Sequence, residues 1–445
     1  MMKQYDLLVI GFGKAGKTLA KFSAGQGKKV AVIEKDQKMY GGTCINVGCI
    51  PSKTLIHDSL NGSSFAEAFD RKREVVSALN NKNYHMLADE PTVDVIDARA
   101  QFKSNNEVAI LDESGQETET ITATDILINT GATPNIPNIE GIKDSKHLYD
   151  SAGIMDLPFQ PENLVIIGGG YIALEFASMF ANLGVKVTVL EHHSDIMPKE
   201  DPEVIELVKE DLTNLGVELV FDAETERFED GEKGTIVYTS KGNFDADAVL
   251  LATGRKPNTE DLGLENTDIK VGERGEVVVN THLQTDVPHV YAACDVVGGM
   301  QFTYISLDDF RIVKDQIFGN GERSTENRGA VPYSVFIDPP LSRVGLTTQQ
   351  AEEQGYNVYE TKVPVKTIPR HKINNDPRGL FKAVIDKDTD QILGVSLYGK
   401  ESEEIINIVK LAIDQKVPYT VLGSNIYTHP TMANLLTTCS NKQLI

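Results

Sequence analysis

Apolar residues along the chain recur in two copies of one strand–helix–strand pattern. In the first copy, the apolar runs YDLLVIG and KVAVIE predict buried strands around a helix, over residues 5–11, 29–34 and 14–27. The second copy repeats this order, with strands over 163–168 and 185–191 and a helix over about 171–183. Apolar strands that alternate with helices form parallel sheets covered by helices. The pattern therefore predicts an α/β protein with two Rossmann-like domains, each able to bind a dinucleotide.

The last part of the chain has a different pattern. Residues 381–399 predict a β-hairpin whose turn is the polar run DKDTDQ, and 401–415 predict a helix. A tail with the sequence THPTMAN follows at 428–434. No low-complexity linker precedes these stretches. We expect an α+β domain that abuts the two Rossmann-like domains.

Composition and charge narrow the classes of function. The 445 residues include 43 basic and 65 acidic side chains, for a formal net charge of −22. We do not expect such an acidic chain to bind nucleic acid or an anionic membrane. No apolar run is long enough to span a bilayer, and the first one continues into a glycine motif, so we interpret it as a strand and not a signal peptide. Four cysteines do not make a secreted disulfide framework, and we expect a cytoplasmic protein.

The first glycine motif has the spacing that a dinucleotide phosphate requires. Gly11, Gly13 and Gly16 follow the first strand and open the helix. Glycine here allows a tight turn, close approach of a pyrophosphate and helix–strand packing, while the helix N-terminus supplies N–H donors. Glu34 ends the next strand, 23 positions after Gly11, where a carboxylate can bind ribose hydroxyls. This set predicts a bound dinucleotide.

The second motif keeps small residues at the same three positions, which are Gly168, Gly170 and Ala173. Glu191 follows Gly168 by the same 23 positions. A carboxylate there accepts hydrogen bonds from a free 2′-hydroxyl and repels a 2′-phosphate, which favours NADH over NADPH. His192 and His193 come next and would soften this repulsion if protonated, so use of NADPH stays possible. We interpret the two histidines as part of a solvated loop, not as a metal site.

Two of the four cysteines, Cys44 and Cys49, lie five positions apart in GGTCINVGCIPSK. One helical turn brings residues at this spacing within disulfide range. A zinc site would need four ligands, and Cys294 and Cys439 lie far away in sequence without forming a second close pair, so we expect no metal site. Pro51 favours a helix start, whose amides would stabilise a thiolate. A disulfide in a reducing compartment is expected to be catalytic, not structural.

These motifs resemble those of a known family. GGTCINVGCIPSK is similar to the redox-disulfide signature of the pyridine nucleotide-disulfide oxidoreductases, which include lipoamide dehydrogenase, glutathione reductase and mercuric reductase. ATGRKPN, the acidic Asp295 after a strand, and the HPT tail recur in the same family. Five further stretches resemble a bacterial branch that contains a reactive-chlorine-resistance flavoprotein and hypothiocyanous acid reductase: CIPSKTLIHD, QFTYISLDDFRIV, DPPLSRVGLT, INIVKLAID and IYTHPTM.

The resemblance implies a domain order. An FAD-binding domain would carry the cysteine pair and would be interrupted by an NAD(P)H-binding domain, before a C-terminal interface domain that forms the dimer. The boundaries we expect are 1–145 and 266–328 for the two parts of the FAD domain, 146–265 for the NAD(P)H domain and 329–445 for the dimerisation domain.

The resemblance also implies roles for single residues. Cys49 would lie against the flavin, Cys44 would face the substrate as the attacking thiol, and the two would form the redox disulfide. Lys53 and Glu175 match an ion pair beside the flavin. His429 matches an acid–base histidine that reaches the cysteine pair of the partner subunit, which implies a homodimer. The matched FAD contacts are Gly11, Gly13, Gly16, Glu34, Thr43, Lys53, Ala100, Gly131 and Asp295. The matched NADH contacts are Gly168, Gly170, Ala173, Glu191, Gly254 and Tyr171, which covers the nicotinamide pocket.

The chain departs from the family pattern near its end. Asn434 stands where the family usually has a glutamate, and Tyr427 where a second histidine is common. An amide can orient the His429 ring but cannot stabilise an imidazolium as a carboxylate does. This favours an oxidant whose leaving group needs little help from a proton. Cys294, where glycine is common, is interpreted as a small buried apolar residue, and Cys439 as a packed or incidental thiol.

The sequence therefore predicts an NAD(P)H-dependent flavoprotein disulfide reductase. Electrons would pass from NADH through FAD and the Cys44–Cys49 disulfide to a small oxidant, with hypothiocyanous acid or a related chlorine or thiocyanate oxidant as the expected substrate. Other readings stay open: reduction of an organic disulfide, of Cu(II) or of Hg(II), a lipoyl dehydrogenase-like activity, or a flavin redox sensor with little turnover. A sensor would not need a proton donor such as His429.

Overall fold

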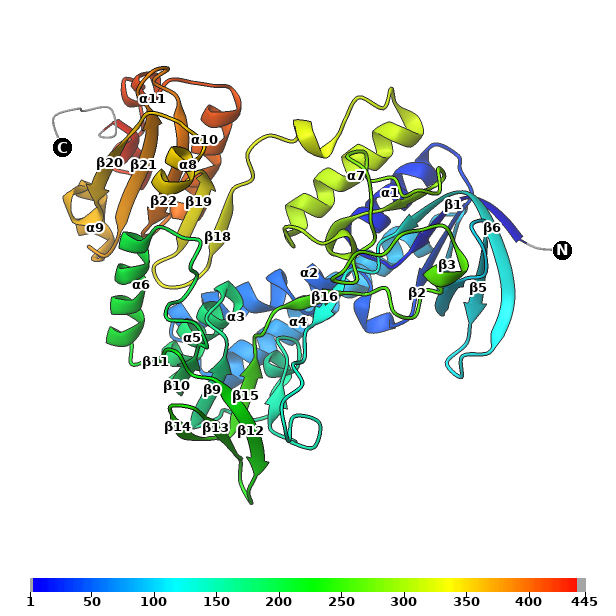
Figure 1. The fold of residues 1–445 in the computed structure, drawn as a ribbon, viewed down its shortest axis with the longest axis horizontal. Coiled ribbons are helices and arrows are strands. Elements are labelled where there is room, and N and C mark those ends of the chain that lie inside the picture. Colours follow the sequence, from blue (N-terminus) through cyan, green and yellow to red (C-terminus); the bar gives the residue numbers. More distant parts are fainter. Residues whose placement is uncertain (1–2, 438–445) are drawn as a thin grey trace.

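The computed structural model describes residues 3–437. Its first sheet has the strand order β3-β2-β1-β6-β5-β4, and β17 pairs with β6 (Figure 1). The strands are β1 (Lys3–Ile10), β2 (Val30–Glu34), β3 (Val93–Asp97), β4 (Arg99–Phe102), β5 (Glu107–Leu111), β6 (Glu117–Ile128) and β17 (Val290–Ala292). Pairs among β1, β2, β3, β6 and β17 are parallel, whereas β4–β5 and β5–β6 are antiparallel. The register places Ile10 beside both Ile33 and Ile128, so the parallel strands end at one edge.

Helices cover the first sheet and carry the cysteine loop. They are α1 (Lys14–Gly25), α2 (Thr43–Asn46), α3 (Cys49–Leu60), α4 (Phe65–Ala88) and α7 (Thr303–Phe318). β1 is apolar on both faces because each face is buried: Val9 packs with Leu19 of α1 and Ile312 of α7, and Leu8 packs on the other side. The long α4 begins with a capping box between Ser64 and Glu67.

The second sheet has the order β11-β10-β9-β15-β8, and all its pairs are parallel. Its strands are β8 (Leu148–Tyr149), β9 (Asn163–Ile167), β10 (Lys186–Leu190), β11 (Glu218–Val220) and β15 (Ala248–Leu251), with helices α5 (Tyr171–Asn182) and α6 (Pro202–Asn214). A small antiparallel sheet joins β12 (Thr225–Asp230), β13 (Thr235–Thr239) and β14 (Gly242–Ala246). The chain leaves the first sheet, builds the second and returns at β17, which is the interrupted order that the sequence predicts. The exact domain boundaries stay a prediction.

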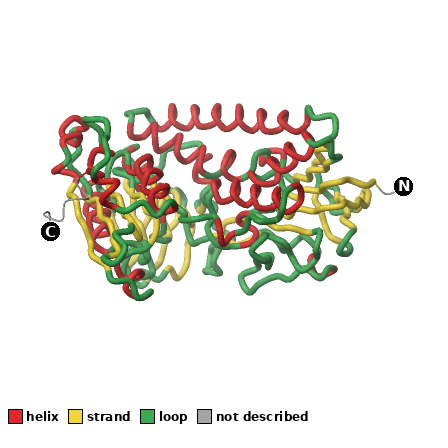
Figure 2. Tube along the Cα trace, turned by 90° about the horizontal axis from the view of Figure 1, so that it is seen from above, coloured by secondary structure: helices red, strands yellow, loops and turns green. Residues whose placement is uncertain are grey.

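The C-terminal part is an antiparallel sheet of order β18-β19-β22-β21-β20. Its strands are β18 (Tyr333–Val335), β19 (Leu341–Gly345), β20 (Val358–Pro364), β21 (Leu380–Asp386) and β22 (Ile392–Tyr398), with helices α8 (Thr348–Glu353), α9 (Pro369–Asn374), α10 (Ser402–Asp414) and α11 (Tyr419–Gly423). The predicted hairpin and helix are β21–β22 and α10. A separate pair, β7 (Ala132–Pro134) with β16 (Arg255–Pro257), links the two nucleotide-binding units. From above, strands gather toward the two ends of the molecule (Figure 2).

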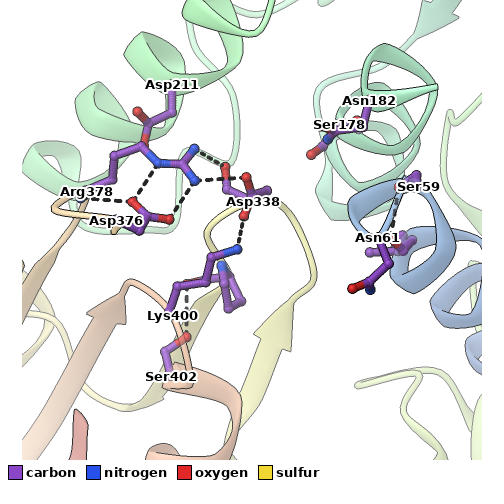
Figure 3. A network of polar contacts seen from close by, with 12 residues as sticks. Ser59, Asn61, Ser178, Asn182, Asp211, Asp338, Asp376, Arg378, Lys400 and Ser402 are labelled. Carbon is purple, nitrogen blue, oxygen red and sulfur yellow. Dashed lines mark hydrogen bonds and ion pairs between the residues drawn. The ribbon is translucent and has the colours of Figure 1, made fainter. Parts of the chain in front are cut away.

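Polar contacts hold segments of the C-terminal part together and join this part to α6. Arg378 Nη2 lies 2.8 Å from Asp338 Oδ2, and Lys400 also pairs with Asp338 (Figure 3). The hydroxyl of Tyr398, the last residue of β22, donates to Asp211 Oδ2 of α6 at 2.6 Å. Tyr398 is buried, and this bond joins the second nucleotide-binding unit to the C-terminal sheet. Within residues 3–437 no helix has both the length and the apolar character needed to cross a membrane.

Candidate active site

A cavity of about 1320 Å³ lies at the carboxyl edge of the first sheet. It reaches from the start of α1 past α3 and α5 to α7 and the C-terminal part. Twelve of the residues predicted for the site line it: Gly11, Gly13, Glu34, Thr43, Cys44, Cys49, Lys53, Ala100, Gly131, Tyr171, Glu175 and Asp295. The structure thus brings residues from both nucleotide-binding units to one wall around the cysteine pair.

The glycine turn before α1 leaves no room for side chains. Gly11 has φ +101, and an added Cβ would lie 2.4 Å from the carbonyl oxygen of Asn129. A Cβ on Gly13 would lie 2.6 Å from Asn129 Oδ1, which accepts the N–H of Gly16 at 2.9 Å. Gly16 does not line the cavity and packs against Val9 instead. The turn therefore brings backbone N–H groups of α1 to the cavity, a shape that fits a pyrophosphate.

Glu34 ends β2 at the edge of the same cavity. Its carboxylate accepts the N–H of Phe12 at 2.9 Å and the N–H of Asp36 at 3.1 Å. Burial raises the pKa of Glu34, and these N–H bonds act against that rise. Asp295 lies after β17 and also faces the cavity; burial raises its pKa and Arg255 lowers it. The glycine turn and the helix N-terminus fit the pyrophosphate of an FAD, and the acidic residue at the end of β2 fits its ribose hydroxyls.

The cysteine pair sits where α2 meets α3. Cys49 is the first residue of α3, its Sγ lies 3.6 Å from the Thr303 hydroxyl oxygen, and both thiols are reduced. A hydrogen bond from the Cys44 thiol, the Thr303 hydroxyl and the charge of Lys53 lower the pKa of Cys49 to about 6, against its burial. The same Cys49 contact, together with burial, raises the pKa of Cys44. Within the pair, the pKa of Cys49 is therefore lower than that of Cys44.

Lys53 and Glu175 form an ion pair beside the cysteines. Lys53 Nζ on α3 lies 2.6 Å from Glu175 Oε2 on α5, and the Glu175 side chain is 5% exposed. The other Glu175 oxygen accepts the N–H of Phe336 at 2.9 Å, and Lys53 Nζ lies 4.9 Å from the centre of the Phe336 ring. The pair therefore joins the first unit, the second unit and the C-terminal part at the cavity wall.

The second glycine motif is a separate surface. Gly168 has φ +109 and lies against the backbone of Ala252, whereas a Cβ on Gly170 would meet no atom within 4 Å. Ala173 is buried in α5, and the Gly254 carbonyl after β15 accepts the N–H of Asn135 at 2.9 Å. The residues of this surface that do not line the large cavity are Gly168, Gly170, Ala173, Glu191 and Gly254.

Glu191 closes this second surface. Its carboxylate accepts the N–H of Gly169 and, at 2.8 Å, the N–H of His193. His192 Nδ1 lies 2.9 Å from Glu191 Oε1, and the two histidine rings stack with centroids 3.7 Å apart. Glu191 and the two histidines lie close enough together to hold a metal ion. The sequence instead predicts that the two histidines belong to a solvated loop.

Tyr171 joins the two surfaces. It is the first residue of α5 and also lines the large cavity. Its ring lies 6.2 Å from that of Phe302, and burial, with Glu175 nearby, raises the pKa of Tyr171 to about 12. The ring therefore stands as a neutral phenol between the second glycine motif and the cysteine pair.

His429 lies apart from the cysteines of its own chain. It is exposed and does not line the cavity, and its Nδ1 lies 3.0 Å from Asn434 Oδ1. The amide that replaces the family glutamate is thus placed to orient the ring. Tyr427, where a second histidine is common, donates its hydroxyl to the Leu422 carbonyl at 3.0 Å. Within one subunit His429 is therefore not part of the cavity wall that holds the cysteine pair.

Three polar neighbours of the site were not predicted from the sequence. Asn129 holds the glycine turn, and its Nδ2 also donates to the sulfur of Cys294 at 3.2 Å. Thr303 contacts Cys49, and Arg255 lies near Asp295. Thr303 falls in a stretch that resembles the bacterial branch, but no local pattern connects it with a cysteine 254 positions away. Cys294 is buried, as expected, and Cys439 lies outside the described residues.

The fold and the site define a class. Residues 5–309 match the family described as pyridine nucleotide-disulphide oxidoreductase, and residues 331–439 match the dimerisation domain of that family. The chain belongs to this family of oxidoreductases, which confirms the predicted fold of two dinucleotide-binding domains and a dimerisation domain.

Individual relatives narrow the class further. The chain is 47% identical over 98% of its length, and 98% of the relative's, to the probable pyridine nucleotide-disulfide oxidoreductase RclA of Escherichia coli (strain K12). It is also similar to a solved structure of the HOCl-induced flavoprotein disulfide reductase RclA in complex with Cu(II), with a TM-score of 0.96 over 99% of each chain and 47% identity. Mercuric reductase of Staphylococcus aureus is 34% identical over 96% of this chain and 80% of its own length. The predicted resemblance to the reactive-chlorine branch is confirmed.

Proposed function

We propose that this protein passes two electrons from NADH, through FAD, to the Cys44–Cys49 disulfide and from there to a small oxidant, with hypothiocyanous acid as the expected substrate. The observation that carries the proposal is the wall of the large cavity. A thiol pair with one low-pKa sulfur lies there between the glycine turn of the first motif and Tyr171 of the second. FAD, when bound, would accept hydride from NADH and reduce the disulfide.

The cysteine chemistry follows from the geometry. Cys44 attacks the sulfur of hypothiocyanous acid while its proton passes to the departing oxygen, so a bond forms between the two sulfurs, the S–O bond breaks and water leaves. The Cys49 thiolate then attacks the Cys44 sulfur, which forms the disulfide and releases thiocyanate. The oxidant gains two electrons and the dithiol loses two. Cys49 suits the second step, because the Thr303 hydroxyl and the charge of Lys53 still lower its pKa after Cys44, whose hydrogen bond lowers it most, has reacted.

His429 places a limit on this scheme. It is exposed and lies outside the cavity of its own subunit, so its action on the thiols requires a homodimer. Asn434 orients its ring without adding negative charge. Thiocyanate is a weaker base than the thiolate of a bulky disulfide and leaves without a proton, and the oxygen of the oxidant leaves as water with the proton of Cys44, so a weaker proton donor suffices. This supports a small oxidant over an organic disulfide or dihydrolipoamide.

The test is anaerobic NADH oxidation by the FAD-loaded protein. Hypothiocyanous acid, oxidised glutathione, lipoamide and Cu(II) are offered separately, with NADPH in parallel. We expect fast turnover with hypothiocyanous acid that falls at least about a hundredfold in Cys44→Ser. Fast turnover with oxidised glutathione or lipoamide alone would overturn the substrate. One stoichiometric oxidation of NADH without turnover would support a redox sensor instead.

Cu(II) is included because a relative's structure is described as a Cu(II) complex. Reduction of Cu(II) that matches the rate with hypothiocyanous acid, and that also requires Cys44, would make the metal ion a second substrate. A rate that persists in Cys44→Ser would assign Cu(II) reduction to the flavin and not to the disulfide.

A further inference from the structure

The turn that leads to Cys44 rests on a buried lysine. Lys17 of α1 is 5% exposed, and its Nζ donates to the Gly41 carbonyl at 3.4 Å and to the side-chain oxygen of Asn83. Gly41 lies three residues before Cys44 in the same tight turn. The ammonium group therefore sits directly behind the loop that presents the attacking thiol to the cavity.

This buried charge has only neutral hydrogen-bond partners. Among residues 3–437 neither Gly41 nor Asn83 provides a carboxylate, and Lys17 joins no ion pair. Burial without a counter-charge is costly, and an apolar side chain of the same length would fill this space more easily. Burial, with repulsion from Lys14, lowers the pKa of Lys17 to about 8, and the field of Cys44 acts against that fall. The negative field that reaches Lys17 comes from the sulfur of Cys44, three residues after the Gly41 carbonyl that Lys17 binds.

Hydrogen bonds from α4 also hold the loop that leads to Cys44. Asn80 of α4 donates to the side-chain oxygen of Asn46 at 3.0 Å, and Asn46 donates to the Gly42 carbonyl at 2.9 Å. Asn83, one turn after Asn80, accepts from Lys17. The turn is therefore clamped between α1 and α4, which fixes the ammonium group relative to the thiol. A fixed charge stabilises a developing charge without reorganisation.

We propose that Lys17 is a positioning residue for Cys44, whose buried ammonium group stabilises the negative charge on the Cys44 sulfur when this thiol loses its proton to attack the oxidant and when it leaves the opened disulfide. The inference rests on the proposed function for the identity of the oxidant. Lys17 supplies positive charge to the Cys44 thiol from within the same subunit. This matters because the residue beside His429 is the amide Asn434, which cannot strengthen the histidine's positive charge as a carboxylate would. The titratable and charged groups whose fields reach the pair are Lys14 for Lys17, and Cys49 for Cys44.

The test measures the ionisation of Cys44 directly. In FAD-loaded Cys49→Ser protein, Cys44 is the remaining thiol of the pair, and its alkylation by iodoacetamide is followed against pH by mass spectrometry of its peptide. We expect Lys17→Met to slow alkylation at pH 7 about tenfold, because the midpoint of the pH profile rises by about one unit. The plateau rate at high pH stays unchanged. Lys17→Arg should keep most of the rate, and Lys21→Met, an exposed lysine one turn later, should change nothing.

A second variant keeps the lysine and removes its effect. Asn83→Asp places a carboxylate beside the ammonium group, so we expect the same upward shift of the Cys44 midpoint. An unchanged midpoint in both variants, or a fall in the plateau alone, would overturn the inference and assign Lys17 a purely structural role. If Lys17→Met loses flavin or unfolds, the midpoint of Cys44 alkylation in Asn83→Asp decides whether the inference stands. Alkylation needs no oxidant, so failure to reduce hypothiocyanous acid would sink the proposed substrate and leave this result standing.

Discussion

The two glycine motifs share one spacing and build two different surfaces. In the first, an added Cβ would come within 2.4, 2.6 and 2.6 Å of another atom, at Gly11, Gly13 and Gly16 respectively. In the second, a Cβ on Gly168 would come within 2.7 Å of the Ala252 carbonyl oxygen, but Gly170 is open and Ala173 already carries a side chain. The same fingerprint thus forms a turn with no room for side chains at Gly11, Gly13 and Gly16, which we call the closed cradle. In the second unit it forms a turn with free space at Gly170, which we call the open shelf. We infer that the cradle holds a resident dinucleotide and the shelf receives one that comes and goes.

The acidic residues that follow the two motifs also differ in their surroundings. Glu34 faces the large cavity, whereas Glu191 lies outside it in the second unit. Both carboxylates accept backbone N–H groups of their own glycine turn, from Phe12 and Gly169 respectively. The contrast therefore lies in what surrounds each turn. The first turn lies on a cavity that α3, α7 and the C-terminal part also line, and the second is bordered by the exposed His192.

The largest effect is expected from Gly11→Ala, which tests the closed cradle. The new Cβ would meet the Asn129 carbonyl oxygen at 2.4 Å, and φ +101 is unfavourable for alanine. The turn must open, which removes the N–H groups from the pyrophosphate position. We expect protein that retains less than about a tenth of its flavin, because loss of close backbone contacts costs several kcal/mol. Absorbance of the purified protein measures this. Full flavin content would contradict the cradle.

A smaller effect is expected from Glu191→Gln on the shelf. The amide keeps one acceptor and loses the charge that holds the N–H groups of Gly169 and His193 and that we propose to bind the ribose hydroxyls. We expect the KM for NADH to rise about tenfold, the usual scale for a lost charge-assisted hydrogen bond, and the preference over NADPH to narrow. Steady-state kinetics with both nucleotides measure this. Flavin content should not change, and a loss of flavin would show that the two motifs are not independent.

Parts of this site that depend on local spacing could be predicted from the sequence. Two motifs with an acid 23 positions later predicted β1–α1–β2 and β9–α5–β10 because turn, helix start and strand end are fixed within one continuous segment. The cysteine pair and its helix start follow for the same reason. The predicted helix over 14–27 ends earlier, at Gly25, because Gln26 caps it before Gly27 turns with φ +75.

Contacts between distant segments could not be predicted. Asn129 lies 113 positions from the Gly16 N–H that it accepts, and Thr303 lies 254 positions from Cys49. The role of Lys17 depends on α4 crossing behind the loop, which no local pattern encodes. His429 was predicted from its HPT context, but its position outside the cavity of its own chain emerges only in three dimensions.

A third prediction concerns Thr303→Val, which tests whether the Thr303 hydroxyl, in the same cavity as the cradle, lowers the pKa of Cys49. The Cys49 thiolate forms above about pH 6 and is lost as the pH falls through that value. Removal of the hydroxyl moves this loss to higher pH, by about half a unit, the equivalent of one weak hydrogen bond. The pH profile of Cys49 alkylation in a Cys44→Ser background measures the shift. The KM for NADH should stay constant, and an unmoved midpoint would remove Thr303 from the site.

The smallest effect is expected from Gly170→Ala, the shelf counterpart of Gly11→Ala. Gly170 has φ −78 and ψ 176, a conformation open to any residue, and its Cβ would meet no atom within 4 Å. The folded state has no clash to relieve, and alanine restricts the unfolded chain, so stability should stay equal or rise by a few tenths of a kcal/mol. We expect flavin content to be unchanged and the KM for NADH to change less than about twofold, because the added methyl group would contact the nucleotide only lightly. A large loss of NADH binding would mean that the nucleotide approaches this backbone as closely as the resident dinucleotide approaches the first motif. The shelf would then be a second cradle that closes only when its ligand is bound.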